Sequence, residues 1–552
     1  MAQVEEEKAV SVKSLQPTRS LLRSVTLIAS CTTAMIVNAA TNTSTAIALP
    51  SIGQDLRISP DKLQWLVSAF ALSSGCLLLF FGRLADLYGR KKAFMVGSLI
   101  QGIFSLGCGF TKSEITIDVL RGIQGCGAAA TIPACLGILA HAFPPSKTRS
   151  VAFATFAAGA PLGAAVGNTL GAILTQFSDP TWRSVFFLST GLNVLCMIGG
   201  AFSIDPDQPS AEANKRVDYI GAFLVTAGLT FIVFVLSDGS VAPQGWATSY
   251  IIALLVLGVL SIIAFLFWQH YLEKRLDDEH FPARRRLPPP IMRLSLWTRA
   301  DGRFAVMQLI AFLNWCSFMS YNFWVQLFYQ DYLRLSPMQT MLRLLPMFIT
   351  GVVCNLIVAL VVGRVDVIYL MLLGTSLTAS ANIFFAVVKP SQTYWAYGLP
   401  SAILSVFGAD FVFSAGTLFV AKVALPHEQS VAGALFQTVT QLGTSFGLAI
   451  TTLVFNRIRT VESAKLDVTV GDGFDSLAPP RAQLIAYRAA EWGGFGFGVV
   501  AAILCFFLRG VGIVGEHDNE DRNTQSSSPV TLKSRDSEEG KMASPSSTSP
   551  TI

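Results

Sequence analysis

Two charged residues lie inside long apolar stretches of the sequence, where a charge needs a physical reason. Asp410 is the only carboxylate near the middle of a stretch that is long enough to cross a bilayer, and Arg121 lies toward one end of another. A charged side chain in hydrocarbon costs roughly 2.5–3.5 kcal/mol on insertion scales, so such residues usually mark a proton, ion or substrate pathway. We therefore predict that Asp410 binds a proton. A structural aspartate that hydrogen-bonds to neighbouring helices is the alternative. Arg121 is expected to face a cavity or a partner, or to extend to the nearby membrane surface.

Uncharged polar residues recur at helical spacing in three further apolar stretches. Polar groups that face lipid are penalised, so these side chains are expected to point inward. Hydrogen bonding between helices accounts for any one of them equally well, but the match between the first and ninth stretches favours a water-filled substrate cavity. The candidate lining residues are Asn38, Thr41, Asn42 and Thr45, then Asn314, Ser317, Tyr321 and Asn322, and finally Gln437 and Gln441.

The elements that must position these residues are membrane-spanning helices. Of the 552 residues, 52% are apolar and 14% are charged, whereas soluble domains are about 25% charged. A bilayer core about 30 Å thick requires roughly 20 apolar residues per helix. We therefore predict an all-α polytopic membrane protein with fourteen transmembrane helices. They lie near residues 25–49, 62–82, 93–111, 115–140, 150–175, 184–204, 218–237, 248–270, 303–327, 339–362, 365–388, 396–423, 428–455 and 487–508.

The distribution of basic residues predicts the orientation of these helices. Lys and Arg are concentrated in the loops after the second, fourth, sixth and eighth stretches, with the loop near 456–486 as the exception. Cytoplasmic loops are the ones enriched in Lys and Arg, so both termini are expected in the cytoplasm. The N-terminal segment has no apolar core of the kind found in signal peptides. The Ser- and Pro-rich C-terminal tail is expected to be disordered, and it is either a regulatory phosphorylation target or simply solvated.

A glycine-rich, basic loop joins the second and third stretches, with the sequence GRLADLYGRKK. Glycine allows a sharp turn between antiparallel helices, Asp86 can cap a helix or pair with an arginine, and the basic cluster anchors the cytoplasmic face. A weaker echo, Gly363-Arg364-Val365-Asp366, follows the tenth stretch and predicts an internal repeat. The residues that define the loop are Gly82, Arg83, Asp86, Gly89, Arg90 and Lys91.

The fifth stretch contains four glycines at a spacing of four residues. This spacing places them on one helix face, where a second helix can approach closely. They are Gly159, Gly163, Gly167 and Gly171, and Pro161 lies among them.

These motifs together resemble the major facilitator superfamily, and within it the family of drug:proton antiporters with fourteen spans. The basic loop is similar to the gating loop of that superfamily, and LRGIQGCGA around Arg121 is similar to its proton-coupling motif in the fourth span. The segment from Gly408 to Thr452 looks like the fungal aminotriazole-resistance and boron-efflux branch. The resemblance covers roughly residues 25–510. It implies two six-helix bundles with two inserted central helices, and no cofactor other than a proton gradient.

The resemblance also predicts how the chain is divided. Residues 1–24 form a cytoplasmic tail, 25–205 the first bundle, 206–270 a linker with the two extra helices, and 271–302 a cytoplasmic loop. Residues 303–510 form the second bundle and 511–552 the disordered tail.

Three positions depart from the pattern of the family. Thr41 stands where the first span usually carries a carboxylate, so that proton site is absent. Asn168 and Ala172 replace the proline and glycine that usually follow Gly167 and Gly171, so the packing groove remains but the proline kink is moved or lost.

Other chemistry finds little support in the sequence. There is no phosphate-binding GxxxxGK[ST] loop and no HExxH or Cys/His metal cluster. The nine cysteines fall inside predicted spans and are expected to pack as small apolar residues. Gly443-Thr444-Ser445-Phe446-Gly447 matches the nucleophile-elbow pattern formally, but it lies in a helical stretch rather than after a strand. We therefore expect neither an enzyme nor a nucleic-acid-binding protein.

The expected function is secondary active export of a small organic molecule in exchange for protons. Such a substrate is a drug, a toxin or a secondary metabolite such as a glycolipid. The alternative is a proton-independent or inward carrier of a small solute resembling ammonium or borate. The partners are the substrate, protons and the lipid bilayer, and the protein is expected to be a monomer. The plasma membrane is the expected location, with the vacuolar membrane as the alternative.

Overall fold

The computed structural model describes residues 21–59, 62–143, 147–207, 216–239, 242–278, 287–362, 364–424, 429–468 and 478–513. Every helix described here belongs to one compact unit within residues 1–514. Several predicted features lie outside the described residues: the N-terminal tail before Leu21, Gly363 of the echo motif, and the disordered tail from 514 onward.

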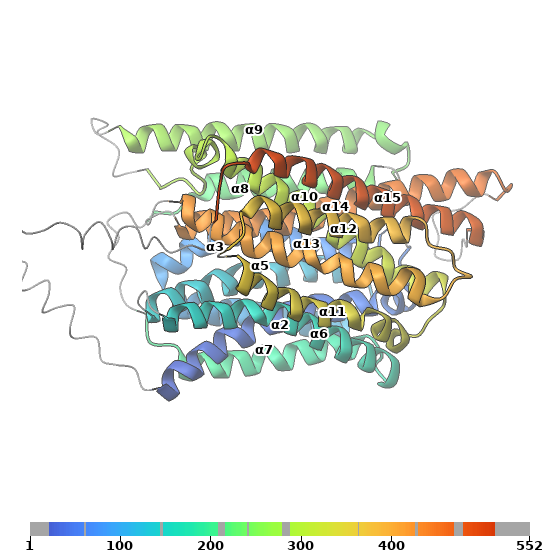
Figure 1. The fold of residues 1–552 in the computed structure, drawn as a ribbon, viewed down its shortest axis with the longest axis horizontal. Helices are drawn as coiled ribbons and strands as arrows, with labels where there is room; N and C mark the ends of the chain where they lie inside the picture. Colours follow the sequence, from blue (N-terminus) through green and yellow to red (C-terminus); the bar gives the residue numbers. More distant parts are fainter. Residues whose placement is uncertain are drawn as a thin grey trace, which may run out of the picture. The chain divides into compact units, whose positions relative to one another are not determined.

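The described residues form fourteen α-helices and no strand (Figure 1). The predicted all-α class is thereby confirmed. Thirteen of these helices are long and apolar enough to cross a membrane; α6 is not among the thirteen. The helices are α2 (Leu21–Leu56), α3 (Trp65–Tyr88), α4 (Arg90–Phe110), α5 (Glu114–Ala142), α6 (Lys147–Phe177), α7 (Arg183–Ser203), α8 (Tyr219–Asp238), α9 (Ser249–Asp277), α10 (Arg303–Leu327), α11 (Pro337–Val361), α12 (Val367–Ala386), α13 (Tyr394–Val423), α14 (Gln429–Ala464) and α15 (Pro480–Cys505).

Helix pairing repeats between the two halves of the chain. In the N-terminal half, α2 packs along α6, α3 along α5 and α4 along α7. In the C-terminal half, α10 packs along α14, α11 along α13 and α12 along α15, which is the same scheme shifted by eight helices. The internal repeat that the sequence predicts is therefore present as two six-helix bundles, α2–α7 and α10–α15.

The helices α8 and α9 form a hairpin between the two halves in sequence, and α9 lies at the edge of the bundle (Figure 1). Buried Asp218 ties the hairpin together. Its carboxylate accepts hydrogen bonds from the Gly221 backbone N–H (2.8 Å), Trp268 Nε1 (2.8 Å) and Gln269 Nε2 (2.7 Å). Gln269 in turn accepts a bond from the backbone N–H of Met292 (3.2 Å), so the chain leading into α10 is held against α9.

The two halves meet where α3 packs on α14 and α6 packs on α11. The helix α2 ends at Leu56, and we call this end of the bundle the Leu56 end. There one apolar cluster combines residues of both halves, including Leu49 and Trp182 from the first and Trp324 and Phe348 from the second. Burial of a shared apolar cluster holds the two halves together at this end.

Two hydrogen bonds also cross between the halves near the Leu56 end. Gln330 Nε2, in the short π-helical turn Phe328–Tyr332 after α10, donates to Ile47 O at 3.0 Å. The backbone N–H of Met338 on α11 donates to Gln176 Oε1 on α6 at 3.1 Å.

At the opposite end of the bundle, Gly89 joins α3 to α4, and we call this end the Gly89 end. In the described residues, the apolar core here consists of two separate clusters. One surrounds Phe94 and contains N-terminal-half residues, and the other surrounds Phe304 in the C-terminal half, with Leu79 packed against its edge. The structure therefore shows a conformation in which the halves are joined more extensively at the Leu56 end than at the Gly89 end.

Candidate functional site

The glycines of α6 bring its backbone against the backbone of α2. A methyl group placed on Gly163 would lie 2.4 Å from Ile36 O, and one on Gly167 would lie 2.3 Å from Ala40 O. Both distances are too short for a real contact, so only glycine fits at these two positions. Thr43 Oγ1 uses this closeness, because it donates to Ala164 O across the contact at 3.1 Å.

Arg121 is fully buried in the N-terminal half, where it joins three helices. Its Nε donates to Leu66 O of α3 (2.8 Å), and its two terminal nitrogens donate to Gln124 Oε1 (2.7 Å) and to Asn42 Oδ1 of α2 (3.2 Å). The guanidinium carbon lies 4.7 Å from the centroid of the Phe70 ring, within range of a cation–π interaction. The side chain therefore does not extend to the membrane surface in this conformation; it faces partners inside the bundle.

Thr41 and Asn42 are adjacent on α2 but face different neighbours. Thr41, at the position where the family usually has a carboxylate, donates to Val37 O (2.8 Å) and to Ser189 Oγ of α7 (3.3 Å). The amide of Asn42 is the group that reaches Arg121. A neutral amide thus accepts the hydrogen bond of the buried arginine.

Two of the candidates on α10 hydrogen-bond within their own half. Ser317 Oγ accepts from Asn382 Nδ2 of α12 (3.1 Å), and Tyr321 OH donates to Ser401 Oγ of α13 (2.9 Å). Both are fully buried. Hydrogen bonding between helices, the alternative given above, therefore describes their contacts in this conformation.

The remaining cavity candidates differ in how deeply they are buried. Asn38, Thr45 and Asn314 are buried, whereas Asn322, Gln437 and Gln441 are partly exposed. Asn322 accepts a bond from Gln326 Nε2 at 2.8 Å. A methyl group on Gly75 of α3 would lie 2.9 Å from Gln441 Cβ, so Gln441 lies where α14 meets α3.

Asp410 lies on α13 at a junction with α11 and α6. A methyl group placed on Gly351 of α11 would be 3.6 Å from Asp410 Oδ2 and 3.9 Å from Pro161 Cβ of α6. Oδ2 is buried and has no hydrogen-bond partner, and the amide of Asn355 on α11 donates to Gly351 O at 2.9 Å. The carboxyl group therefore lies beside the contact between the two halves, next to the proline of the glycine-rich helix.

The basic loop at the Gly89 end is bound to the end of α7. Asp86 accepts from Arg90 Nε (3.0 Å) and from a terminal nitrogen of Arg90 (2.9 Å), which is the arginine pairing that the sequence allowed. The helix cap comes from Asp207, whose carboxylate accepts from the backbone N–H groups of Lys91 (2.8 Å) and Lys92 (3.0 Å). Asp207 could not be identified from the sequence, because it lies more than a hundred residues from the helix that it caps.

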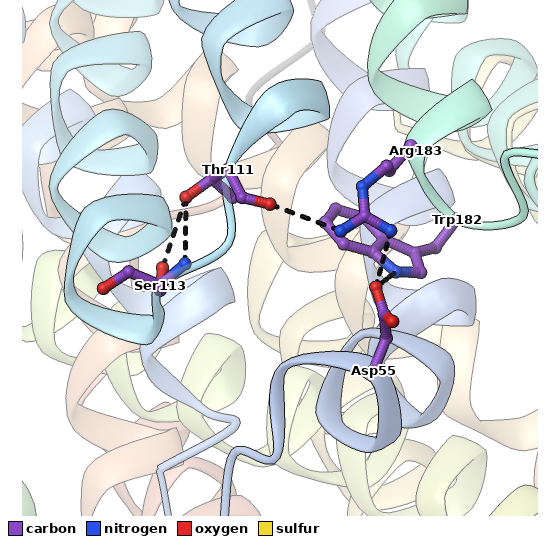
Figure 2. Close-up of polar contacts among 5 residues, drawn as sticks. All are labelled: Asp55, Thr111, Ser113, Trp182 and Arg183. Atoms are coloured by element: carbon purple, nitrogen blue, oxygen red, sulfur yellow. Dashed lines mark hydrogen bonds and ion pairs between the residues drawn. The ribbon is translucent and has the colours of Figure 1, made fainter.

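At the Leu56 end, a carboxylate clamps three helices of the N-terminal half (Figure 2). Asp55 Oδ2 accepts from Trp182 Nε1 (3.0 Å) and from a terminal nitrogen of Arg183 (2.5 Å). The other terminal nitrogen of Arg183 donates to Thr111 O at 3.4 Å, and the guanidinium lies over the Trp182 ring. The clamp joins the end of α2, the end of α4 and the start of α7.

One buried carboxylate was placed wrongly by the sequence analysis. A span predicted to begin near residue 487 put Glu491 at its edge, but α15 begins at Pro480, so Glu491 is the twelfth residue of a 26-residue helix. Its side chain is 2% exposed. The expectation that Asp410 is the only carboxylate near the middle of a span is therefore wrong. Pro479 and Pro480 were the available signal, because proline is favoured in the first turn of a helix.

Two repeated six-helix halves, joined by an inserted hairpin and crossing the membrane many times, define a membrane carrier for small molecules. The chain belongs to the Major Facilitator Superfamily, whose family model matches residues 31–218 and 211–448.

Named relatives support its place in the drug-efflux branch, as the sequence predicted. The puromycin resistance protein pur8 of Streptomyces alboniger is 32% identical over 411 residues, covering 73% of this chain and 76% of that protein. The aminotriazole resistance protein of Saccharomyces cerevisiae is 24% identical over 484 residues, covering 86% and 82%. A third relative is named for a different substrate. It is a low affinity ammonium transporter of the same yeast, 28% identical over 405 residues, covering 72% of this chain and 74% of that protein.

The solved structures agree on the fold. The human organic anion transporter MFSD10 matches 89% of this chain and 100% of its own, with a TM-score of 0.56 at 11% sequence identity. At that identity the likeness concerns the fold alone.

Proposed function

We propose that this carrier exports a small organic molecule in exchange for protons by alternating access. The observation that carries the proposal is the position of Asp410. Its carboxyl group is buried beside the contact between the halves, and one oxygen has no hydrogen-bond partner. Gain or loss of a proton at this position changes the charge at the α6–α11–α13 junction, which is a contact that must rearrange if the halves rock.

Arg121 has a second role in this proposal. It is a buried cation bound by backbone and amide oxygens of α2, α3 and α5, and Thr41 leaves it without the usual family carboxylate on α2. We infer that Arg121 fixes the relative positions of these three helices and sets the positive potential in the N-terminal half.

The two glycine-containing motifs have separate roles in the proposal. The glycine face of α6 keeps α2 and α6 moving as one body. The basic loop closes the Gly89 end in the opposite conformation.

The proton gradient supplies enough free energy for this function. One proton entering down about 100 mV releases roughly 2.3 kcal/mol, and one pH unit adds about 1.4 kcal/mol. The sum of about 3.7 kcal/mol sustains a several-hundred-fold gradient of a neutral substrate.

We propose that the Gly89 end and both termini face the cytoplasm, because the loops at that end carry most of the basic residues. The conformation described here is then the one that is closed toward the outside. The division into bundles at residues 25–205 and 303–510, and a location in the plasma membrane, belong to the same proposal.

Inside-out vesicles from cells that produce the protein test proton exchange. With an imposed pH gradient, acid inside, addition of puromycin or aminotriazole is expected to dissipate the gradient faster than in vesicles without the protein. These probes are chosen because relatives are named for resistance to them. Uptake of either compound at an unchanged rate of proton leak would contradict the exchange mechanism.

A proton-independent carrier of a small solute is the second candidate. It is favoured by Thr41, which removes the usual carboxylate of the first helix, and by the relative that is named as an ammonium transporter. In right-side-out vesicles this candidate predicts uptake of labelled methylammonium without any imposed pH gradient, and no response to puromycin or aminotriazole.

A further inference from the structure

Glu491 belongs to a face of α15 that packs inside the C-terminal half. Gly494 and Gly498 follow it at helical spacing on the same side of the helix. A methyl group on Gly494 would lie 2.1 Å from Asn382 Oδ1 of α12, and one on Gly498 would lie 3.1 Å from Ser317 Oγ of α10. The two glycines thus let α15 pack against polar side chains of α10 and α12. Glu491 lies at one end of this row of three residues.

The oxygens gathered on this face lack donors. Both carboxyl oxygens of Glu491 are buried without a hydrogen-bond partner, and so is Asn382 Oδ1. Of the donors nearby, the Asn382 amide and the Tyr321 hydroxyl are already engaged, whereas the Ser317 hydroxyl, which accepts from Asn382, keeps one O–H to donate. Asn382 Nδ2 donates to Ser317 Oγ (3.1 Å) and to Thr378 O (2.9 Å), and Tyr321 OH donates to Ser401 Oγ (2.9 Å). One hydroxyl cannot satisfy the three unpartnered oxygens, and a proton on Glu491 would supply a second O–H donor and remove one of the acceptors.

The charged and titratable groups around Glu491 do not provide a cation. Tyr321 of α10 and Tyr329 of the turn after α10 are the titratable groups that interact with it from the neighbouring elements. On α15 itself, Arg488 donates to Val388 O instead. On α14, Arg459 lies over the Phe455 ring, and Glu462 pairs with Lys465. The titratable residue of α12, Tyr369, is exposed near the other end of that helix. An isolated carboxylate buried in this way is strongly destabilising, whereas a neutral acid is tolerated.

We propose that Glu491, with Asn382 and Ser317, forms a second proton-binding site inside the C-terminal half, which holds a proton in the conformation described here. The site is distinct from the Asp410 junction, because it lies between α10, α12 and α15 rather than at the contact between the halves. Its existence does not depend on the proposed export. A role for the Glu491 proton in the transport cycle, by contrast, rests on that proposed function.

Infrared spectroscopy of the purified full-length protein tests the site without any substrate. At pH 7.5 the wild type is expected to show a carboxylic-acid C=O band that Glu491→Gln loses. The matched control Glu462→Gln, which makes the same change in a carboxylate paired with Lys465, is expected to keep the full band. The component of the band that Glu491→Gln removes is expected to remain in the Asp410→Asn variant. Identical wild-type and Glu491→Gln spectra in this region would overturn the proposal.

Isotope labelling makes the test independent of how well the variant folds. Wild-type protein with carboxyl-¹³C-labelled glutamate is expected to shift the band at pH 7.5, whereas labelled aspartate is expected to leave that component in place. A glutamate label that shifts nothing would overturn the site. Failure of the vesicle experiment with an intact glutamate band would overturn the proposed function alone.

Discussion

The substitution Asp410→Asn is expected to abolish proton-linked export while leaving the amount of folded protein unchanged. Asparagine has nearly the same shape as aspartate, so the junction between α6, α11 and α13 should still pack. It cannot exchange a proton, however, and the charge at the contact between the halves would no longer change during the cycle. We expect the dissipation of the pH gradient by puromycin to fall to the level of vesicles without the protein.

Two control variants make this result interpretable. Asp410→Glu keeps a titratable carboxyl and is expected to retain part of the activity. Asp301→Asn changes a side chain that is 93% exposed, and it should behave as the wild type. Full proton exchange by Asp410→Asn would remove this residue from the mechanism and leave the structural role that the sequence analysis kept as its alternative.

The substitution Gly167→Ala is expected to cause the largest loss of stability of any single methyl group added to α6. The new carbon would lie 2.3 Å from Ala40 O and 2.5 Å from Ala40 Cα. Overpacking a well-packed core usually costs roughly 1–3 kcal/mol, and here the clashing atoms belong to the backbone of α2, which cannot rotate away. We expect a large fall in the yield of monodisperse protein and in its melting temperature.

The matched controls are glycines in other helices with open space around them. A methyl group on Gly122 of α5 or Gly191 of α7 would meet no atom within 4 Å. Gly122→Ala and Gly191→Ala should leave the melting temperature unchanged or slightly higher, because alanine favours the helix. Equal losses at Gly167 and Gly191 would show that close packing of α2 and α6 is not what these glycines provide.

The membrane class, the helix count and the repeat could be predicted from sequence because they depend on local chemistry. Long apolar runs specify spans whatever they pack against, and the glycine spacing of α6 specifies a close-packing face. Arg121 was recognised as unusual for the same reason, since a charge in an apolar run is visible without knowing its partners.

Partners that are distant in the chain could not be predicted in this way. Nothing local links Arg121 to Leu66 O and Asn42, or Asp207 to the start of α4. Thr41 and Asn42 are neighbours in sequence, and only the helix packing shows that one faces Ser189 and the other faces the arginine. Glu491 was missed through an error of seven residues in a helix start, because the first turns of α15 are not apolar enough to extend the predicted span.

Cross-linking across the Leu56 end tests most directly whether the two halves must separate there for transport. Gln176 and Met338 are in contact across the halves, and eight of the nine native cysteines are buried, so a Gln176→Cys/Met338→Cys pair can be bridged selectively. We predict that a short reducible thiol cross-linker blocks puromycin-driven proton exchange in this double variant, that reduction restores it, and that neither single variant responds. Continued exchange with the bridge in place would contradict alternating access in this protein.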